Sequence, residues 1–197
     1  MHERRFNPSR AHLLEDPERK TWLPPDEIVA ALNLTKGETV VDIGAGTGYF
    51  ALPMAATVGS AGRVFAVDVS PEMLERLRNK LAAAGVGNVQ CVEGEASSTS
   101  LPAGCATVVF MANVWHEFDD HAAVLAEARR MLKPGGRVAI LDWRPDAEPG
   151  HGPPIAHRIP LSAAESSIQD AGFVLEHSGN IGRYSWLLIG RSAVSTS

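Results

Sequence analysis

The 197-residue chain has only two cysteines and no long hydrophobic run. Cys91 and Cys105 form no CxxC pair and lack the spacing of metal ligands, so we interpret both as free thiols of a reducing compartment and expect no metal site. No apolar run approaches membrane-spanning length, and the first residues lack the apolar segment of a signal peptide. We therefore predict a cytoplasmic protein without a membrane partner.

Basic residues are also few. The 18 Lys and Arg are outnumbered by 23 Asp and Glu, and the formal net charge is -5. Because no Lys/Arg cluster offers a surface for a phosphate backbone, we predict no nucleic-acid partner and favour a small-molecule one. The length suits one domain with a sizeable core and is too short for two full ones.

Strand-like and helix-like runs alternate along the middle of the chain. Strands are predicted at residues 39–43, 63–67, 88–92, 107–111 and 137–143, and helices at 48–57, 71–84 and 121–132. This alternation predicts an α/β fold, a Rossmann-like doubly wound parallel sheet with helices on both faces. Ligands of such sheets bind at the carboxyl ends of the strands.

The two ends of the chain differ from the middle. A proline-rich loop at 145–160, a helix at 162–171 and a hairpin of runs 173–176 and 184–189 are predicted. The first 36 residues contain an amphipathic helix that begins at Asp26 and Glu27, and Arg19 and Lys20 are expected on the outside of this N-terminal segment. We predict an N-terminal helical cap at 1–36, a main domain at 37–191 and a tail at 192–197. Residues 1–34 and the proline-rich loop are expected to cover the ligand cleft and select the acceptor. The loop would place Arg144, His157 and Arg158 within reach of that acceptor.

The stretch Val40 to Phe50, VVDIGAGTGYF, combines a strand, an acid, three alternating glycines and a helix start. Glycine at alternate positions removes side chains where the backbone turns sharply or passes close to a ligand. Asp68, at the end of the second strand, follows the glycine turn by about 20 residues, the distance expected for an acid that accepts hydrogen bonds from ribose hydroxyls. The arrangement predicts a nucleotide site.

Two details favour S-adenosylmethionine as the cofactor. A dinucleotide site requires GxGxxG, whereas here the third glycine is Gly48 and Tyr49 stands where the last glycine is needed. Asp42 would repel a pyrophosphate, yet it suits the ammonium group of an amino-acid cofactor. An NAD(P)-dependent oxidoreductase and a noncatalytic S-adenosylmethionine-binding module remain the alternatives.

Five stretches in this order resemble the class I S-adenosylmethionine-dependent methyltransferases, especially the group that includes the ubiquinone/menaquinone C-methyltransferases. They are VVDIGAGTGYF, VFAVDVSPEML, VEGEASSTSLP, ANVWHEFDD and RMLKPGGRVAILDW, within Trp22 to Ile189. The resemblance implies seven strands, mostly parallel with the last antiparallel, and methyl transfer to a small-molecule acceptor by direct in-line displacement. Residues 37–191 would be the methyltransferase domain.

The resemblance also implies roles for residues of the glycine turn. Gly44, Ala45 and Gly46 would form the turn beneath the methionine and ribose parts of the cofactor. Asp42 would be linked to the methionine end, and Asp68 would hold the ribose hydroxyls.

Further along the chain, the resemblance implies an adenine site. Val69 would pack on the adenine, and Glu95 would lie near its amino group, although Asp is common in the family at this position. Ala96 would supply backbone contacts, and Asn113 would line the reactive end of the cofactor.

Few catalytic residues are expected, because the sulfonium of the cofactor already activates the methyl group. If the acceptor has an acidic hydrogen, His116 is the first candidate for the proton acceptor and Glu117 the second. Both residues would equally suit the start of the next helix. The sequence leaves open which atom is methylated, whether a base is used and the oligomeric state.

Overall fold

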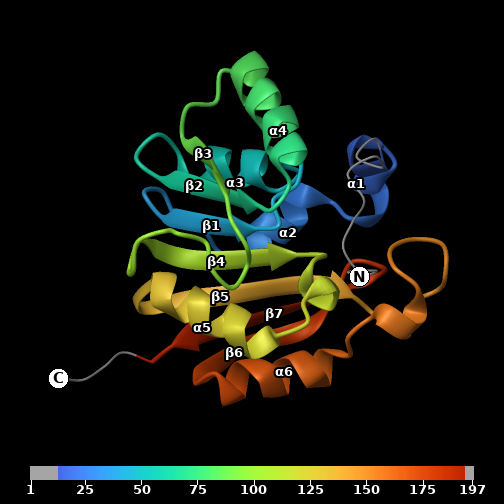
Figure 1. Cartoon of the computed structure of the whole chain (residues 1–197). Helices are drawn as coiled ribbons and strands as arrows, with labels where there is room; N and C mark the ends of the chain where they lie inside the picture. The colour runs from blue at the N-terminus through green and yellow to red at the C-terminus, as the bar shows by residue number, and fades with distance from the viewer. Residues whose placement is uncertain (1–12, 194–197) are drawn as a thin grey trace.

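The computed structural model describes residues 13–193, which form one seven-stranded sheet in the order β3-β2-β1-β4-β5-β7-β6 (Figure 1). The strands are β1 (Thr39–Ile43), β2 (Arg63–Asp68), β3 (Val89–Glu93), β4 (Ala106–Ala112), β5 (Leu132–Trp143), β6 (Phe173–Ile181) and β7 (Ser185–Ser192). Strand β7 runs antiparallel to both of its neighbours, and the other pairs are parallel. The predicted fold class is confirmed.

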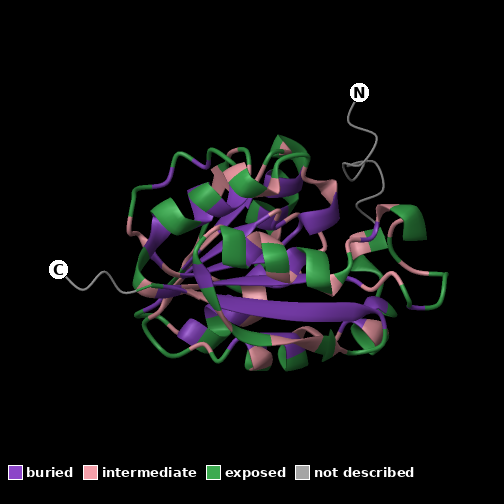
Figure 2. Cartoon of the chain, turned by 90° about the horizontal axis from the view of Figure 1, so that it is seen from below, coloured by how far each residue is buried: buried purple, intermediate pink, exposed green. Residues whose placement is uncertain are grey.

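Helices cover both faces of the sheet. The α-helices are α1 (Arg19–Trp22), α2 (Pro25–Ala31), α3 (Ala51–Val58), α4 (Pro71–Ala84), α5 (His121–Met131) and α6 (Leu161–Asp170), and the short 3-10 helices are η2 (Trp115–Glu117) and η3 (Ile155–His157). Apolar side chains of α2, α3 and α4 pack on one face, and those of α5 and α6 pack on the other. Figure 2 shows the buried strands between helices whose outer surfaces are exposed.

Helix α4 begins and ends where its sequence predicts. The Ser70 side chain accepts a hydrogen bond from the backbone N–H of Met73, and Pro71 occupies the first turn, where no intrahelical partner is needed. Gly85 adopts the left-handed conformation that ends the helix. These local signals determine where α4 begins, and because α4 directly follows β2, they also determine where the chain leaves β2.

Some elements differ in extent from the prediction. Strand β5 begins at Leu132 rather than at residue 137, because Leu132 already pairs with Ala106, and a register shift accommodates the glycines that follow. The N-terminal helix that begins at Asp26 and Glu27 is present as α2, and the short helix α1 precedes it, separated from it by Pro24 and Pro25. The second of these, α2, packs against the sheet through Ile28 and Val29.

Strands β1 and β4 lie side by side, yet the chain leaves them in opposite directions. After β1 it passes to α3 on one face and on to β2, whereas after β4 it passes to η2 and α5 on the other face and on to β5. Such a reversal opens a crevice at the carboxyl ends of the two strands, where doubly wound sheets bind ligands. No helix within residues 13–193 is long and apolar enough to cross a membrane.

Candidate functional site

A cavity of about 640 Å³, here called the pocket, opens at this crevice. Its volume falls within the range of small-molecule and cofactor sites. The predicted cofactor residues that line it are Asp42, Gly44, Ala45, Gly46, Asp68, Val69, Glu95, Ala96 and Asn113. The structure thus brings together residues from four separate loops. Gly48 is the predicted cofactor residue that lies outside the lining.

The glycine turn is held to β2 by its backbone. The N–H groups of Gly44 and Ala45 both donate to the Val67 carbonyl, at 2.8 and 3.0 Å. At Gly44 the backbone has φ of 72°, and a Cβ there would come within 2.5 Å of Val114. At Gly48 a Cβ would come within 2.3 Å of Leu77, so this glycine lets α4 approach the turn.

Asp68 is fixed by two backbone donors. One carboxylate oxygen accepts from the N–H of Gly46 at 2.8 Å, and the other accepts from the N–H of Ser70 at 2.9 Å. Burial raises the pKa of Asp68, and the backbone hydrogen bonds oppose this effect without cancelling it. A carboxylate has about four lone-pair sites, so acceptor capacity remains for two hydroxyl groups of a ligand.

Asp42 is more deeply buried than Asp68. Its side chain lies at the end of β1, and the residue is only 3% exposed. Burial, with a smaller contribution from the charge of Asp68, raises the pKa of Asp42 to about 8. An ammonium group placed beside this carboxyl would favour its charged form and bring the pKa down again.

Asn113 provides a separate indication of a ligand. It follows β4 in the left-handed conformation, with φ of 57°, and its backbone N–H donates to the Leu141 carbonyl at 2.8 Å. Neither its amide oxygen nor its amide nitrogen has a hydrogen-bond partner among residues 13–193, although both atoms are buried. Buried polar groups are nearly always paired. These two atoms, next to the glycine turn, therefore fit a polar ligand such as S-adenosylmethionine.

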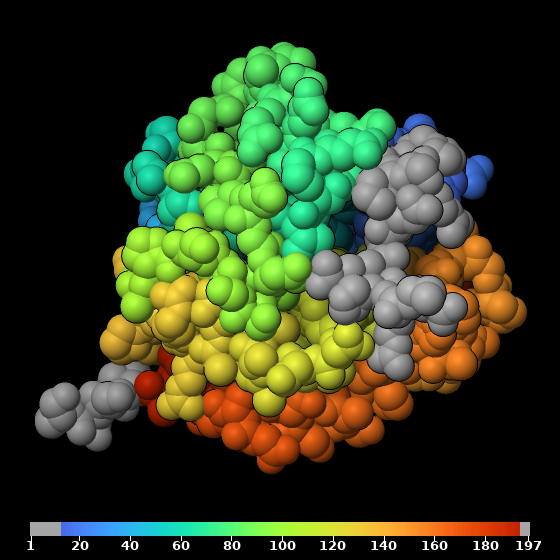
Figure 3. Space-filling model, viewed as in Figure 1, coloured from blue at the N-terminus to red at the C-terminus, as the bar shows by residue number. Residues whose placement is uncertain are grey.

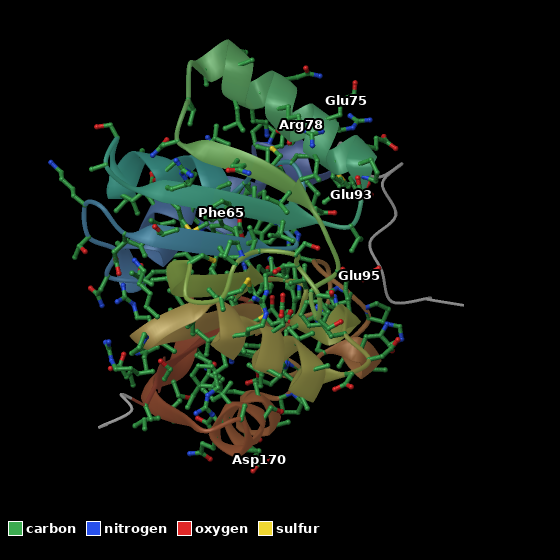
Figure 4. The ribbon with its side chains drawn as sticks, turned by 60° about the vertical axis from the view of Figure 1, so that its left-hand side comes forward. Phe65, Glu75, Arg78, Glu93, Glu95 and Asp170 are labelled. Carbon is green, nitrogen blue, oxygen red and sulfur yellow. The ribbon has the colours of Figure 1, made fainter. Side chains whose placement is uncertain are left out.

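The loop after β3 forms another wall of the pocket. The N–H of Gly94 donates to the Asp68 carbonyl, and Thr99 is bound to Glu127 on α5 through both its backbone N–H and its hydroxyl. Figure 3 shows this loop crossing the molecule between α4 and α5. Figure 4 places Glu95 between the α4 layer, marked by Glu75 and Arg78, and the half that carries α6.

His116 lies behind the pocket rather than in its lining. The residue is 6% exposed, and its ring Nδ1 is 2.9 Å from a carboxylate oxygen of Asp142. Asp142 is fully buried at the end of β5 and also accepts from the backbone N–H groups of His116 and Trp143. Burial alone would lower the pKa of His116, but its hydrogen bond to Asp142 and the charges of Asp142 and Glu117 raise it overall.

Glu117 does line the pocket, together with Phe118 and Asp119 from the same segment. Its carboxylate oxygen Oε1 lies 4.0 Å from Nε2 of His116. The side chains of Asp142, His116 and Glu117 thus form a row from the buried end of β5 to the pocket. No local sequence pattern pairs Asp142 with His116, because 26 residues separate the two.

Arg19 was predicted to lie outside, and this prediction is wrong. It is 8% exposed and lines the pocket together with Leu14. Arg19 stands three and four residues before Trp22 and Leu23, and residues at this spacing share one face of a helix. That spacing was the signal available in the sequence.

The proline-rich loop contributes no residue to the pocket lining within the part of the chain that the structure describes. Arg158 is buried, and its guanidinium donates to the backbone carbonyls of Pro153, Arg144 and His151. The prediction that Arg158 reaches an acceptor is therefore wrong, because this side chain holds the loop together. Residues 1–12 and 194–197 of the predicted cap and tail lie outside the described residues.

Comparison with known proteins gives consistent matches. Residues 40–136 match the family described as "Methyltransferase domain". The chain is 31% identical over 117 residues to the demethylmenaquinone methyltransferase of Geobacillus kaustophilus. It is 38% identical over 118 residues to the ubiquinone/menaquinone biosynthesis C-methyltransferase UbiE of Marinomonas sp.. These matches cover 59% and 57% of this chain, and 50% and 45% of the relatives, so the chain spans about half the length of the curated relatives it matches.

Solved structures share the fold over nearly the whole chain. A crystal structure of an S-adenosylmethionine-dependent methyltransferase from Aquifex aeolicus aligns with a TM-score of 0.90 and 29% identity, covering 95% of this chain and 99% of that one. The cyclase SpnF also aligns, with a TM-score of 0.75 and 17% identity over 86% of this chain and 81% of its own. The second likeness shows the fold alone, and it illustrates that one fold can serve different reactions.

Proposed function

Because the chain belongs to the class I S-adenosylmethionine-dependent methyltransferases, we propose that it transfers the methyl group of S-adenosylmethionine to a small-molecule acceptor. The observation that carries this proposal is the fixed carboxylate of Asp68, held by the N–H groups of Gly46 and Ser70 at the rim of the glycine turn. When bound, S-adenosylmethionine supplies a methyl group that its sulfonium already activates. The protein is left to bind, orient and exclude water.

We assign the cofactor side of the pocket as follows. Asp68 accepts hydrogen bonds from the ribose hydroxyls, with its orientation preset by backbone donors. Asp42 accepts from the methionine ammonium group, and Asn113 uses its two buried amide atoms at the reactive end. Val69 and Glu95, on the loops after β2 and β3, receive the adenine. Gly44, Ala45 and Gly46 let the ligand approach the backbone.

On the acceptor side, we propose that Glu117 faces the reacting group and that His116 acts through it. Glu117 lines the pocket, whereas His116 lies behind it and is held by Asp142. A cationic His116 at 4.0 Å from Oε1 would keep Glu117 ionised and fixed in place. Glu117 then orients an acceptor with a hydroxyl, an amine or an acidic carbon, and takes up its proton. His116 is accordingly a positioning residue, and Glu117 is the candidate base.

The size and charge of the pocket support a small-molecule acceptor. Its volume of about 640 Å³ admits a cofactor and a small molecule, and its lining has more acidic than basic residues, which disfavours a phosphate backbone. The curated relatives are named for menaquinone and ubiquinone biosynthesis, and they make an aromatic ring carbon one acceptor to test first. We place the reaction in the cytoplasm, where the free thiols of Cys91 and Cys105 remain reduced.

An acceptor screen with isotopically labelled S-adenosylmethionine tests the proposal. Wild-type protein should label at least one small molecule from quinol, phenol and amine libraries, and Glu117→Gln should lower the turnover of that acceptor by about 10²–10⁴-fold. Glu72→Gln, on the exposed face of α4, is the matched control and should keep full turnover. Unchanged turnover in Glu117→Gln would show that Glu117 is not the base. Binding of S-adenosylmethionine without any labelled product would favour the noncatalytic alternative.

A further inference from the structure

The side chains of Thr99, Glu127 and Arg130, here called the clamp, tie the loop after β3 to α5 from outside the pocket lining. Glu127 is 8% exposed, and its Oε1 accepts from the backbone N–H and the hydroxyl of Thr99, at 2.8 and 2.7 Å. Arg130 binds the same carboxylate, since its Nε donates to Oε2 at 2.7 Å and its Nη2 donates to Oε1 at 2.8 Å. The proposed chemistry uses none of these three side chains.

The clamp holds a loop segment that forms one wall of the pocket. Residues 94–97 line the pocket, and the loop folds back on itself, because the N–H of Ser98 donates to the Glu95 carbonyl at 3.0 Å. Gly94 packs on Thr99, since a Cβ at Gly94 would come within 3.1 Å of the Thr99 carbonyl oxygen and within 3.2 Å of its Cα. A shift of Thr99 should therefore move the whole segment.

The Glu127 carboxylate is ionised at any pH used in an assay. The hydrogen bond from Arg130 lowers the pKa of Glu127 to about 2, burial opposes this effect, and the hydrogen bonds from Thr99 add to it. An ion pair with one exposed partner contributes little net stability, and the Arg130 side chain is 40% exposed. The hydrogen bonds of a fully paired network do fix where its members lie. The clamp is therefore better explained by the position it gives Thr99 than by stability.

We propose that Glu127 is a positioning residue for base recognition: through Thr99 it sets the place of Glu95, and so the selectivity of the pocket for adenine over other purines. This inference rests on the proposed function, in which Glu95 receives the adenine. Glu127 acts through the loop and touches neither the ligand nor the reacting atoms. Val124, three residues before Glu127 on α5, lines the pocket itself. Helix α5 thus supports the pocket both directly and through the clamp.

Two ligands that differ only in the base test the proposal without any acceptor. Calorimetry gives the affinities of S-adenosylhomocysteine and of S-inosylhomocysteine, in which a carbonyl oxygen replaces the amino group of adenine. Because the Glu95 carboxylate accepts from that amino group and repels that oxygen, wild type should prefer S-adenosylhomocysteine by about 10–100-fold. Glu127→Gln should lose most of this preference, because its amide nitrogen is a donor that faces the donors of Thr99 or Arg130.

Glu38→Gln is the matched control for a charge pair with a structural role alone. Glu38 binds Arg137 at 3.2 Å and directly precedes β1, at the end of the strand opposite the pocket. This variant should melt at a lower temperature than wild type and keep the full preference for S-adenosylhomocysteine. Thr99→Ser retains both donors to Glu127 and should behave as wild type. Thr99→Val removes only the hydroxyl, so it should lose part of the preference and tests the clamp even if Glu127→Gln does not fold.

A double variant shows whether the effect passes through Glu95. Once Glu95→Ala has removed the contact with the base, adding Glu127→Gln should change the preference no further, because the two effects are not independent. If Glu127→Gln keeps the wild-type preference, if Glu38→Gln loses it to the same extent, or if the losses in the double variant add, this inference alone is wrong. Wild type that binds both ligands equally also contradicts the inference and leaves the proposed function intact. Wild type that binds neither ligand but binds NAD overturns both.

Discussion

The two sides of the pocket hold their carboxylates in different ways. On the cofactor side, Asp68 is fixed by backbone N–H groups of adjacent turns, so its orientation comes with the turn itself. On the acceptor side, Glu117 lies next to His116, whose ring is bound to the buried carboxylate of Asp142. This contact between His116 and Asp142 joins η2 to the end of β5. Changes on the first side should therefore alter ligand affinity without unfolding the protein. Substitutions of the buried pair on the acceptor side should mainly lower the free energy of unfolding.

The largest effect is expected for His116→Gln, which leaves Asp142 buried without its cationic partner. Removing one partner of a buried pair costs about 3–5 kcal/mol, so the free energy of unfolding in urea should fall by that amount. His177→Gln, at an exposed position, is the matched control and should change little. A stability loss as small as that of the control would show that the buried pair does not hold the acceptor side.

The pH dependence of this loss sharpens the comparison. Because the pKa of His116 is raised in the folded protein, the stability that its charged form provides is fully present below its unfolded pKa of about 6.5. It is lost as the pH rises through the raised pKa. The difference between wild type and His116→Gln should accordingly be larger at pH 6 than at pH 9, and a difference that grows with pH contradicts this assignment.

A smaller effect, on affinity alone, is expected for Asp68→Ala on the cofactor side. Losing this carboxylate leaves ligand hydroxyls without acceptors, which should weaken S-adenosylhomocysteine binding by about 1–3 kcal/mol. Asp170→Ala, on the distant helix α6, is the control and should bind as wild type does (Figure 4). Equal affinities for Asp68→Ala and wild type would remove Asp68 from the site.

The effect expected for Asp42→Asn on stability has the opposite sign to that of His116→Gln. The pKa of Asp42 is about 8 in the folded protein and about 3.9 when unfolded, so wild type loses stability as the pH rises between these values. The asparagine variant does not titrate. Its ligand-free stability relative to wild type should therefore improve by at least about 1 kcal/mol between pH 4.5 and pH 8, while its affinity for S-adenosylhomocysteine falls. Urea unfolding at both pH values measures this, and a relative stability independent of pH would show that Asp42 is already ionised in the ligand-free protein.

The same difference between the two sides explains what the sequence could predict. Asp42, the glycine turn and Asp68 lie on consecutive elements, and their geometry follows from a strand end, a turn and a helix start. The partnership of His116 with Asp142 depends on the pairing of β4 with β5, which no local pattern reveals. The prediction that Arg19 is exposed is wrong because the burial of its side chain depends on how α1 packs against Tyr49. The fold was predictable because each helix and strand carries its own signals.

Calorimetric titration of the wild-type protein with S-adenosylhomocysteine and with NAD tests the central claim most directly. The claim is that the glycine turn and Asp68 form an S-adenosylmethionine site. S-adenosylhomocysteine should bind at one site per chain, and NAD should produce no binding heat and should not compete. Binding of NAD with no response to S-adenosylhomocysteine would contradict the claim and favour an oxidoreductase.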